Sequence, residues 1–320
     1  MRPPGRGFTA RAACASVHPL MSQSAIKIGV RGNRLGLSIG QAIADLLRPH
    51  LGHAALEFVP VPDVPRRGLA WPGASLERAL AQGDVDLAIQ NAKDLGPDPV
   101  PGITLAAVTQ RFTPFDVLIA MEEVILDELP EGAALSAHTP LRRAQLLNYR
   151  NDFRIVDFAG SLDERITMLE RGDVDGLVVS ASAVEHFGFQ DRVTEIFTTE
   201  VLVPAAGQGA AVIEVRNGNK DLLKAARHLD DSIARPEFEM ERGFLRVLRA
   251  DPTAPVGALA TTEGNILRLE GIIAEREGRR VFRDVETGGP GEEVAIATRL
   301  AQRLLLEGGR QALAAVGIRE

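Results

Sequence analysis

Short apolar segments alternate with amphipathic segments along the first two thirds of the chain. Apolar runs bounded by glycine or polar residues predict strands, whereas apolar residues at every third or fourth position predict helices. The strands are expected at residues 25–30, 55–61, 85–89, 103–109, 116–121, 153–158, 174–179 and 210–215. The helices are expected at residues 37–51, 75–81, 141–149, 161–171, 221–229 and 236–248. This alternation predicts a mostly parallel sheet with helices on its faces.

One part of this pattern occurs twice. The sequence Gly-Asp-Val-Asp stands at residues 83–86 and again at residues 172–175, each time after a helix that contains Leu-Glu-Arg. Each copy leads into an apolar strand, so the two copies share their setting as well as their residues. A shared setting favours two similar α/β lobes. The helix before the second copy is expected to begin with a capping box formed by Ser161 and Glu164.

The pattern changes after Pro255. Strands are predicted at residues 256–260, 266–274 and 280–285, separated by glycine-containing turns, and a long helix is predicted at residues 292–307. Antiparallel strands followed by one helix form a small α+β domain. The expected fold class is therefore α/β, with two lobes and a small α+β C-terminal domain.

The composition of the 320 residues is that of a folded globular protein, with 45% hydrophobic and 25% charged residues. The net charge of −7 lacks the basic excess of many nucleic-acid-binding proteins, and 4% aromatic residues argue against a base-stacking platform. No apolar run approaches the roughly 20 residues of a membrane helix. The single cysteine, Cys14, excludes an intrachain disulfide and a thiolate zinc cluster. His50 and His53 have no clear third ligand nearby, so no metal site is expected.

Residues 1–24 contain several arginines and no acidic residue, a composition found in transit peptides. An amphipathic pattern is missing, however, and Met21 is a plausible start just before the first strand. We therefore favour a leader that is disordered or not translated over a targeting sequence. The segment has no convincing apolar signal core, so we expect a cytoplasmic protein.

Candidate chemistry gathers at the carboxyl ends of the predicted strands, where ligands bind in open α/β sheets. The strand at residues 85–89 leads into Lys93 and Asp94, which form either a solvated pair or a carboxylate site for a cationic or N–H-rich ligand. The first strand leads into Arg31 and Arg34, ahead of a helix N-terminus that favours an anion. A plain strand-to-helix turn is an equal alternative there.

Two further arginines, Arg142 and Arg143, open a predicted helix. Positive charges at a helix N-terminus oppose the macrodipole, so a bound anion would relieve the repulsion, unless one arginine turns to solvent. Arg111 follows another strand and is a further candidate, whereas the glycine-rich loop at residues 205–210 suits architecture better than chemistry. Arginines facing one carboxylate across a cleft describe either a carboxylate-binding module or an enzyme acting on a polycarboxylate.

These residues, in this order, resemble the blocks of the porphobilinogen deaminase (hydroxymethylbilane synthase) family. The family's A-T-R-x-S-x-L-A block is similar to residues 29–36, and its H-S-M-K-D-V-P block is similar to residues 90–96. The blocks S-S-L-R-R, R-G-N-V-x-T-R and L-P-A-x-G-Q-G-A correspond to residues 139–143, 159–165 and 203–210. The last block is nearly intact, and the resemblance extends from about residue 26 to the C-terminus.

The resemblance implies a fold and an activity. Two lobes like those of type II periplasmic binding proteins would precede a third domain that carries a cysteine on a loop. The division is then a first lobe of residues 25–110 and 202–217, a second lobe of residues 111–201, and a C-terminal domain of residues 218–320. The family condenses four porphobilinogens into a linear tetrapyrrole with release of ammonia. A dipyrromethane cofactor, attached to the cysteine by a thioether, primes the chain.

The resemblance also assigns roles to individual residues. Asp94 would be the catalytic residue that holds pyrrole N–H groups and stabilises cationic azafulvene intermediates, because a fixed carboxylate suits developing positive charge. The family's basic residues bind the acetate and propionate groups of the pyrroles, and arginine pairs with a carboxylate in a bidentate way. By position, the substrate-binding residues would be Arg31, Lys93, Arg111, Arg142, Arg143 and Arg165.

The sequence departs from the family at the cofactor-attachment position. The family's block E-R-x-F-x-x-x-L-x-G-G-C-x-x-P-x-G corresponds to residues 241–257, and Pro252 stands in place of the cysteine. Proline has no nucleophile, so covalent attachment of the dipyrromethane is not expected. Two polar residues of other blocks are also replaced, by Ala159 and Asn91, and the family's lysine-bearing flap corresponds to residues 60–72, which contain no lysine.

Three hypotheses follow. The first is a transferase that condenses porphobilinogen into hydroxymethylbilane without the thioether. The second is a non-catalytic diverged paralogue that binds a pyrrole carboxylate or another small anion in the interlobe cleft, and the third is a sensor unrelated to pyrroles, which keeps only the fold. The expected partner is a small-molecule polycarboxylate pyrrole, with no nucleic acid and no membrane, and the expected state is a monomer.

Overall fold

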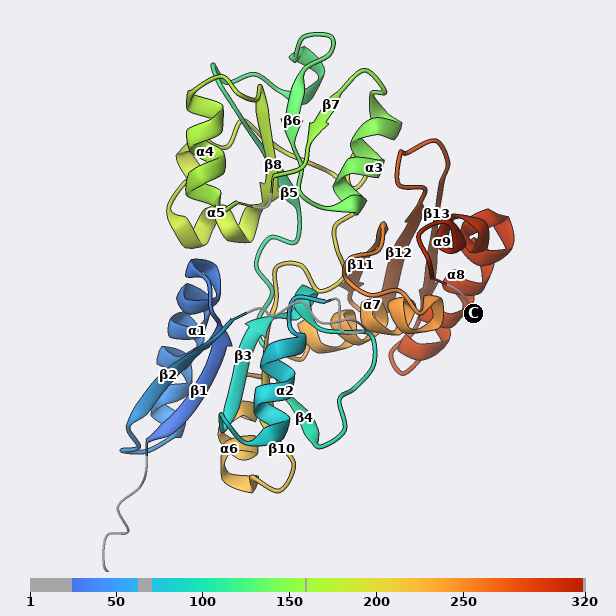
Figure 1. The fold of residues 1–320 in the computed structure, drawn as a ribbon. Helices are drawn as coiled ribbons and strands as arrows, with labels where there is room; N and C mark the ends of the chain where they lie inside the picture. The colour runs from blue at the N-terminus through green and yellow to red at the C-terminus, as the bar shows by residue number, and fades with distance from the viewer. Residues whose placement is uncertain (1–24, 63–70, 159, 319–320) are drawn as a thin grey trace, which may run out of the picture.

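The computed structural model describes residues 25–62, 71–158 and 160–318 as two α/β lobes and a smaller third unit (Figure 1). Each lobe is built around a five-stranded sheet and the third unit around a three-stranded sheet. The predicted α/β class, with two lobes and a small α+β domain, is thereby confirmed. The predictions for residues 1–24, including Cys14, for residues 63–70 and for Ala159 lie outside the described residues.

The sheet of the first lobe has the strand order β2-β1-β3-β10-β4. Its strands are β1 (Ile26–Arg31), β2 (Leu56–Val61), β3 (Leu87–Asn91), β4 (Ile103–Val108) and β10 (Ala211–Arg216). Helices α1 (Arg34–Leu47) and α6 (Lys220–Ala226) pack on one face, and α2 (Ala74–Gln82) packs on the other. The expected division places α6 in the C-terminal domain, whereas its buried side chains join the core of the first lobe.

The sheet of the second lobe has the strand order β7-β6-β8-β5-β9. Its strands are β5 (Asp116–Ala120), β6 (Ala134–Ser136), β7 (Arg154–Val156), β8 (Gly176–Ser180) and β9 (Glu195–Ile196). Helix α3 (Pro140–Tyr149) packs on one face, and α4 (Leu162–Glu170) and α5 (Ala181–Phe187) pack on the other. The predicted capping box is present at the start of α4, where Ser161 and Glu164 exchange hydrogen bonds.

The chain passes between the lobes twice, from β4 to β5 and from β9 back to β10 (Figure 1). Strands β5 and β10 are the ones that the chain enters after a crossing, and each runs antiparallel to both of its neighbours. The remaining neighbours pair in parallel. The mostly parallel sheet that the alternation predicts therefore holds in each lobe, with one reversed strand where the chain arrives from the other lobe.

The repeated Gly-Asp-Val-Asp segment occupies equivalent places in the two lobes. Gly83 and Gly172 both adopt positive φ angles, of 83° and 75°, directly after a helix. The carboxylates of Asp86 and Asp175 then accept hydrogen bonds from backbone N–H groups of β1 and β6, at 2.9 and 2.7 Å. These turns use the last residues of the repeat, so β3 and β8 each begin two residues later than the apolar pattern predicts.

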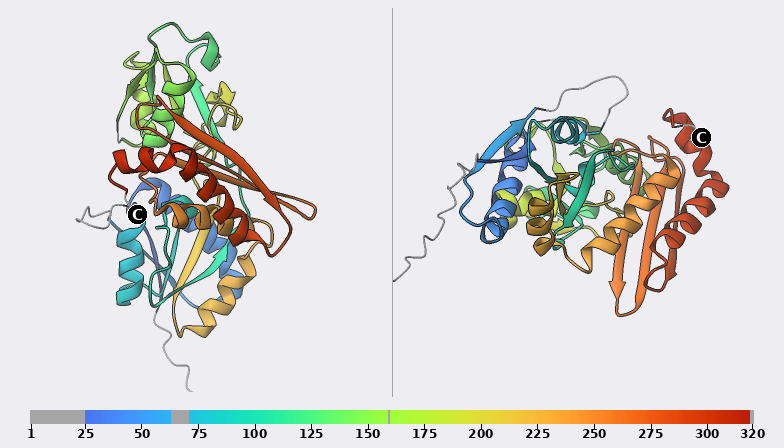
Figure 2. Two further views of the ribbon diagram at one scale, coloured as in Figure 1. Left: turned by 90° about the vertical axis from the view of Figure 1, so that its right-hand side faces the viewer. Right: turned by 90° about the horizontal axis from the view of Figure 1, so that it is seen from below.

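The third unit consists of three antiparallel strands, covered on one face by helices (Figure 2). The strands are β11 (Val256–Glu263), β12 (Ile266–Ala274) and β13 (Val281–Gly288), and the helices are α7 (Ala234–Leu248), α8 (Glu293–Leu304) and α9 (Arg310–Ala315). Residues of all three helices share one core with β11 and β12. On the opposite face, Ile272 packs against Leu141 and Val203, which joins this unit to the lobes.

The sequence pattern misses β6, β9, α5 and α9, because segments this short show no clear period. Short turns complete the structure at η1 (Arg48–His50), η2 (Ala92–Asp94), η3 (Leu126–Glu128), η4 (Gln190–Arg192), η5 (Arg227–Leu229) and η6 (Leu305–Gly309). Of the helices described, none has both the length and the apolar character that crossing a bilayer requires.

Candidate active site

Asp94 lies where two neighbouring parallel strands end. Strand β3 ends at Asn91, and the single turn η2 then carries Asp94 inward, so that the residue is only 6% exposed. Arg31, at the end of β1, donates a hydrogen bond from Nη1 to Oδ2 of Asp94 at 2.6 Å. The two residues that the sequence predicts from separate strand ends are therefore brought into direct contact.

Lys93 connects three segments of the chain. Its Nζ donates to Oε1 of Gln208 at 3.1 Å and to Oγ of Ser180, at the end of β8, at 3.4 Å. Burial and the nearby Arg142 guanidinium lower the pKa of Lys93 to about 8, against the opposing effect of Asp94. Within the described residues Nζ thus contacts two neutral oxygens and has no carboxylate within ion-pair distance.

Arg142 is paired with a carboxylate of its own lobe. It lies in the first turn of α3, where Thr139 caps the helix by accepting from the backbone N–H of Arg142. Its Nε and Nη2 donate to Oδ2 and Oδ1 of Asp116, at 3.1 and 2.8 Å. Gln208 donates to the same Oδ1 at 2.8 Å. The repulsion expected at this helix N-terminus is therefore offset by a protein carboxylate.

The loop at residues 205–210 positions Gln208. Gly207 has a φ of 79°, and a Cβ there would lie 2.7 Å from the carbonyl carbon of Ala92. Gly209 has a φ of 88°, and a Cβ there would lie 2.7 Å from the carbonyl oxygen of Phe112. Only glycine allows this close approach to η2 and to the first interlobe crossing. The loop's architecture thus serves the site, by placing the Gln208 amide between Lys93 and Asp116.

These groups line one cavity of about 130 Å³ where the two lobes meet the third unit. Its polar lining comes from Lys93, Asp94, Asp116, Thr139, Arg142 and Gln208, and its apolar lining includes Pro72, Leu141, Leu245 and Pro252. The structure thus brings Asp94, Lys93 and Arg142 to the same space as Pro252, with Arg31 supporting Asp94 from the side. Asp116 and Gln208 belong to the site although sequence reasoning missed them; the glutamine between two glycines was the only signal.

Three predicted arginines do not line this cavity. Arg111 pairs with the fully buried Glu241, at 2.7 and 3.2 Å. Arg143 pairs with Glu277, in the turn between β12 and β13, at 2.6 Å. Arg165 donates to the main-chain oxygens of Ser136 and Val178, at 2.6 and 3.0 Å. Arg165 and both of these partners lie inside the second lobe.

Arg165 and Arg111 differ in how their positive charges are compensated. Burial and the Arg142 charge lower the pKa of Arg165 to about 9, so its positive charge is poorly compensated. Glu241, by contrast, accepts from Arg111 and also from the backbone N–H groups of Gly207 and Ala260, at 2.5 and 2.7 Å. Arg111 and Glu241 thereby fasten the glycine-rich loop to α7 and β11.

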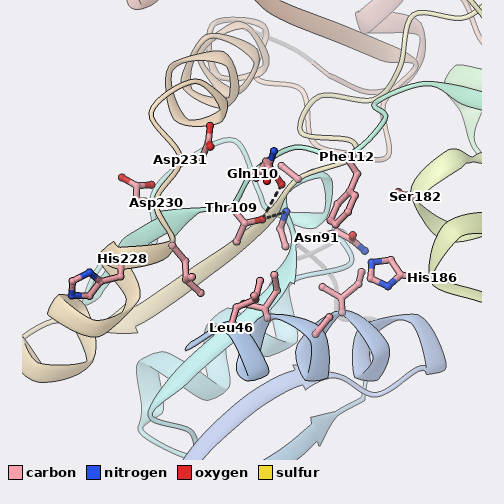
Figure 3. A pocket seen from close by; sticks show the side chains of 17 residues that line it. Leu46, Asn91, Thr109, Gln110, Phe112, Ser182, His186, His228, Asp230 and Asp231 are labelled. Atoms are coloured by element: carbon pink, nitrogen blue, oxygen red, sulfur yellow. Dashed lines mark hydrogen bonds between the residues drawn. The ribbon is translucent and has the colours of Figure 1, made fainter. Parts of the chain in front are cut away.

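A larger pocket of about 310 Å³ lies between α1 and α5 (Figure 3). Apolar residues of α1, including Leu46, form one side, and Phe112, His186 and Asp230 also line the pocket. Asp230 already pairs with Arg235 at 2.7 Å, and the pocket contains none of the predicted charged site residues.

In the part of the chain that is described, no group of three or more potential ligands could hold a metal ion. The smaller, charged cavity is therefore the candidate active site.

Comparisons with known proteins identify the family of the chain. Residues 71–224 match the family model described as porphobilinogen deaminase, dipyromethane cofactor binding domain, and residues 237–306 match the porphobilinogen deaminase C-terminal domain. Porphobilinogen deaminase of Syntrophus aciditrophicus is 36% identical over 295 residues, covering 89% of this chain and 96% of that protein. The enzyme of the same name from a Roseiflexus species is 35% identical over 304 residues, covering 92% of this chain and all of that protein.

Among solved structures, the VFT2 domain of Bordetella pertussis BvgS is 17% identical, with a TM-score of 0.41 over 68% of this chain and 91% of that chain. The two family models match successive parts of the chain, and the relatives match it over nearly its whole length. The chain belongs to the porphobilinogen deaminase family.

Proposed function

We propose that the protein condenses porphobilinogen head to tail into hydroxymethylbilane, with release of ammonia, in tetrapyrrole biosynthesis. The observation that carries the proposal is the buried carboxylate of Asp94, which faces a cavity in a chain of the porphobilinogen deaminase family. Loss of ammonia from porphobilinogen leaves a cationic azafulvene, in which the pyrrole nitrogen shares the positive charge. A fixed carboxylate beside that nitrogen lowers the energy of the cation.

Arg31 holds the Asp94 carboxylate in place. Its guanidinium Nη1 donates a hydrogen bond to Oδ2 of Asp94 at 2.6 Å. The carboxylate oxygens also accept hydrogen bonds from pyrrole N–H groups, which orients the ring. Both roles need the charge of Asp94 and a geometry fixed before the substrate arrives.

The acetate and propionate groups of the substrate need cations. Arg142 supplies a guanidinium to the lining of the cavity, and Lys93 supplies an amine. Arg142 is bonded to Asp116, so it offers its remaining N–H groups. We assign Arg165, Arg143 and Arg111 to later positions of a growing chain or to structural roles, because none of the three lines the cavity.

The family's cofactor is a dipyrromethane, and the fit of this chain to a tethered dipyrromethane is poor. Pro252 lines the cavity at the attachment position and has no sulfur. At about 130 Å³ the cavity is smaller than the roughly 300–1,000 Å³ of drug-sized ligand sites, which suits one small ring rather than several. No step of the proposed reaction therefore passes through a thioether-bound primer.

A second candidate is a non-catalytic member of the family that binds a pyrrole carboxylate. It is favoured by Pro252 and by the engagement of Arg142 and Arg143 with protein carboxylates. Under either function we propose a cytoplasmic monomer with a small pyrrole polycarboxylate as its ligand. The compartment, the monomeric state and the ligand are predictions from the sequence.

The test is consumption of porphobilinogen by the purified protein, with the product oxidised and measured as uroporphyrin. Turnover that is lost in Asp94→Asn supports the proposed transferase. Folded protein that binds porphobilinogen in calorimetry without consuming it supports the second candidate instead. Calorimetry on Asp94→Asn then tells whether the carboxylate contributes to binding.

A further inference from the structure

A covalent bond to the enzyme would hold the first ring in place while later rings are added. Pro252 offers no nucleophile for such a bond. Among the described residues around the cavity, the other candidate atoms are carboxylate, hydroxyl and amine groups. Asp94 and Asp116 are each bound to an arginine, and Thr139 is used as the helix cap of α3. The amine of Lys93 is the nucleophile that remains.

The contacts of Nζ suit a neutral, nucleophilic amine. A neutral lysine has two hydrogens and one lone pair. The two hydrogens have acceptors in Gln208 and Ser180, at 3.1 and 3.4 Å, and neither acceptor is charged. The lone pair is then free to point into the cavity that Lys93 shares with Asp94 and Pro252.

Electrostatics agree with this geometry. Burial and the Arg142 charge lower the pKa of Lys93 from 10.5 to about 8. Near neutral pH a much larger fraction of this amine is therefore unprotonated than in an ordinary lysine. A lysine activated in this way is a known type of enzyme nucleophile.

We propose that Lys93 is the covalent anchor of the first pyrrole, in place of the missing cysteine. The inference rests on the proposed function, because porphobilinogen is the molecule attached. The aminomethyl carbon–nitrogen bond of porphobilinogen breaks, ammonia leaves, and the Nζ lone pair forms a new bond to the same methylene carbon. The proton released from Nζ is balanced by the proton carried away on the leaving amine, and nothing is oxidised or reduced.

The new bond is an aminomethyl-pyrrole bond like the one in the substrate, so it is reversible by the same chemistry. After the last ring is added, cleavage between Nζ and the methylene carbon regenerates the amine and an azafulvene at the first ring. Water adds to that methylene, which gives the hydroxymethyl end of the product. Asp94, at the same cavity, stabilises the cation in both directions.

The experiment is intact-protein mass spectrometry after incubation with porphobilinogen and rapid denaturation in the cold. The expected result is an adduct of one or more porphobilinogen units, each less ammonia, and peptide fragmentation then places it. The chain has only four lysines, Lys27, Lys93, Lys220 and Lys224, so the sites are easily separated. Lys93→Arg keeps the positive charge without the nucleophile and is expected to lose the adduct.

Lys224→Arg is the matched control, because Lys224 is exposed on α6 and is expected to leave the adduct unchanged. An adduct on Lys93 supports the anchor, even if the protein does not turn over. Conversion of porphobilinogen by unmodified protein overturns the anchor and leaves the proposed function standing. Absence of both the adduct and turnover overturns both. If Lys93→Arg does not fold, the position of the adduct on the native chain decides alone.

Discussion

Arg142 and Asp116 face each other with two parallel hydrogen bonds, Nε to Oδ2 at 3.1 Å and Nη2 to Oδ1 at 2.8 Å. Both side chains are at most 10% exposed, and Gln208 donates a further bond to the same carboxylate. This pair joins α3 to the first strand of the second lobe and to the returning loop. Arg142, which we expect to bind the substrate, therefore also forms a salt bridge within the protein.

Asp116→Asn is expected to lower the free energy of unfolding by about 3–5 kcal/mol, because it leaves the buried Arg142 charge without its partner. Urea denaturation measures the loss. Glu277→Gln is the control, since it breaks the exposed pair with Arg143 and is expected to cost at most about 1 kcal/mol. Equal losses in the two variants would show that the buried pair contributes no more to the free energy of unfolding than the exposed pair does.

Asp94→Asn is expected to lower kcat for porphobilinogen by about 10²–10³-fold, because the azafulvene cation loses its counter-charge. The measurement is uroporphyrin formed per unit time, with the melting temperature as a check of folding. Asp98→Asn changes an exposed carboxylate four residues further on, and it should leave kcat unchanged. An active Asp94→Asn variant would remove Asp94 from the mechanism.

Gly207→Ala is expected to destabilise the fold more than Gly188→Ala does. Both positions have positive φ, of 79° and 72°, so both substitutions carry the backbone cost of roughly 1–2 kcal/mol. Only at Gly207 would the new Cβ also meet the backbone of Ala92, at 2.7 Å, whereas nothing lies within 4 Å at Gly188. Unfolding curves compare the two variants, and Gly207→Ala should in addition lose turnover, because its loop positions Gln208. Equal stability of both would show that the loop has room to move.

The pH dependence of stability should contain a contribution from Glu214. Its carboxyl is buried in the first lobe, where Gln90 donates to it at 2.9 Å. Burial, with the repulsion of Glu77, raises the pKa of Glu214 to about 7. The folded state therefore binds this proton more tightly than the unfolded state does. The contribution is fully present below about pH 4.5 and is lost as the pH rises through 7.

Glu214→Gln, which imitates the protonated acid, should be more stable than the native protein at pH 8 and similar to it near pH 4.5. Urea denaturation at the two pH values measures the difference. Glu239→Gln, an exposed change on α7, is expected to have no such pH dependence. If the stability of the native protein and that of Glu214→Gln depend on pH to the same extent, the dependence comes from other groups.

Much of the fold could be predicted from the sequence, because strands and helices depend on local patterns. The alternation of apolar and amphipathic segments locates most elements of both lobes, and the repeated Gly-Asp-Val-Asp segment indicates that the lobes are similar. Lys93 and Asp94 could be predicted as candidate site residues because they follow a buried strand directly, and the structure places both at one cavity. The shortest elements, such as β6 and β9, were missed because too few residues carry the pattern.

The sequence by itself determined the kind of protein and the position of Asp94 at a strand end, and it predicts that Pro252 stands at the family's cofactor-attachment position. Only the tertiary structure decided which cations line the cavity and which are bound elsewhere. Asp116 and Arg142 are 26 residues apart, and Arg111 and Glu241 are 130 residues apart, so no local pattern reveals these pairs. The physical reason is that an ion pair depends on distance in space. That distance is set by the packing of the two lobes and the third unit.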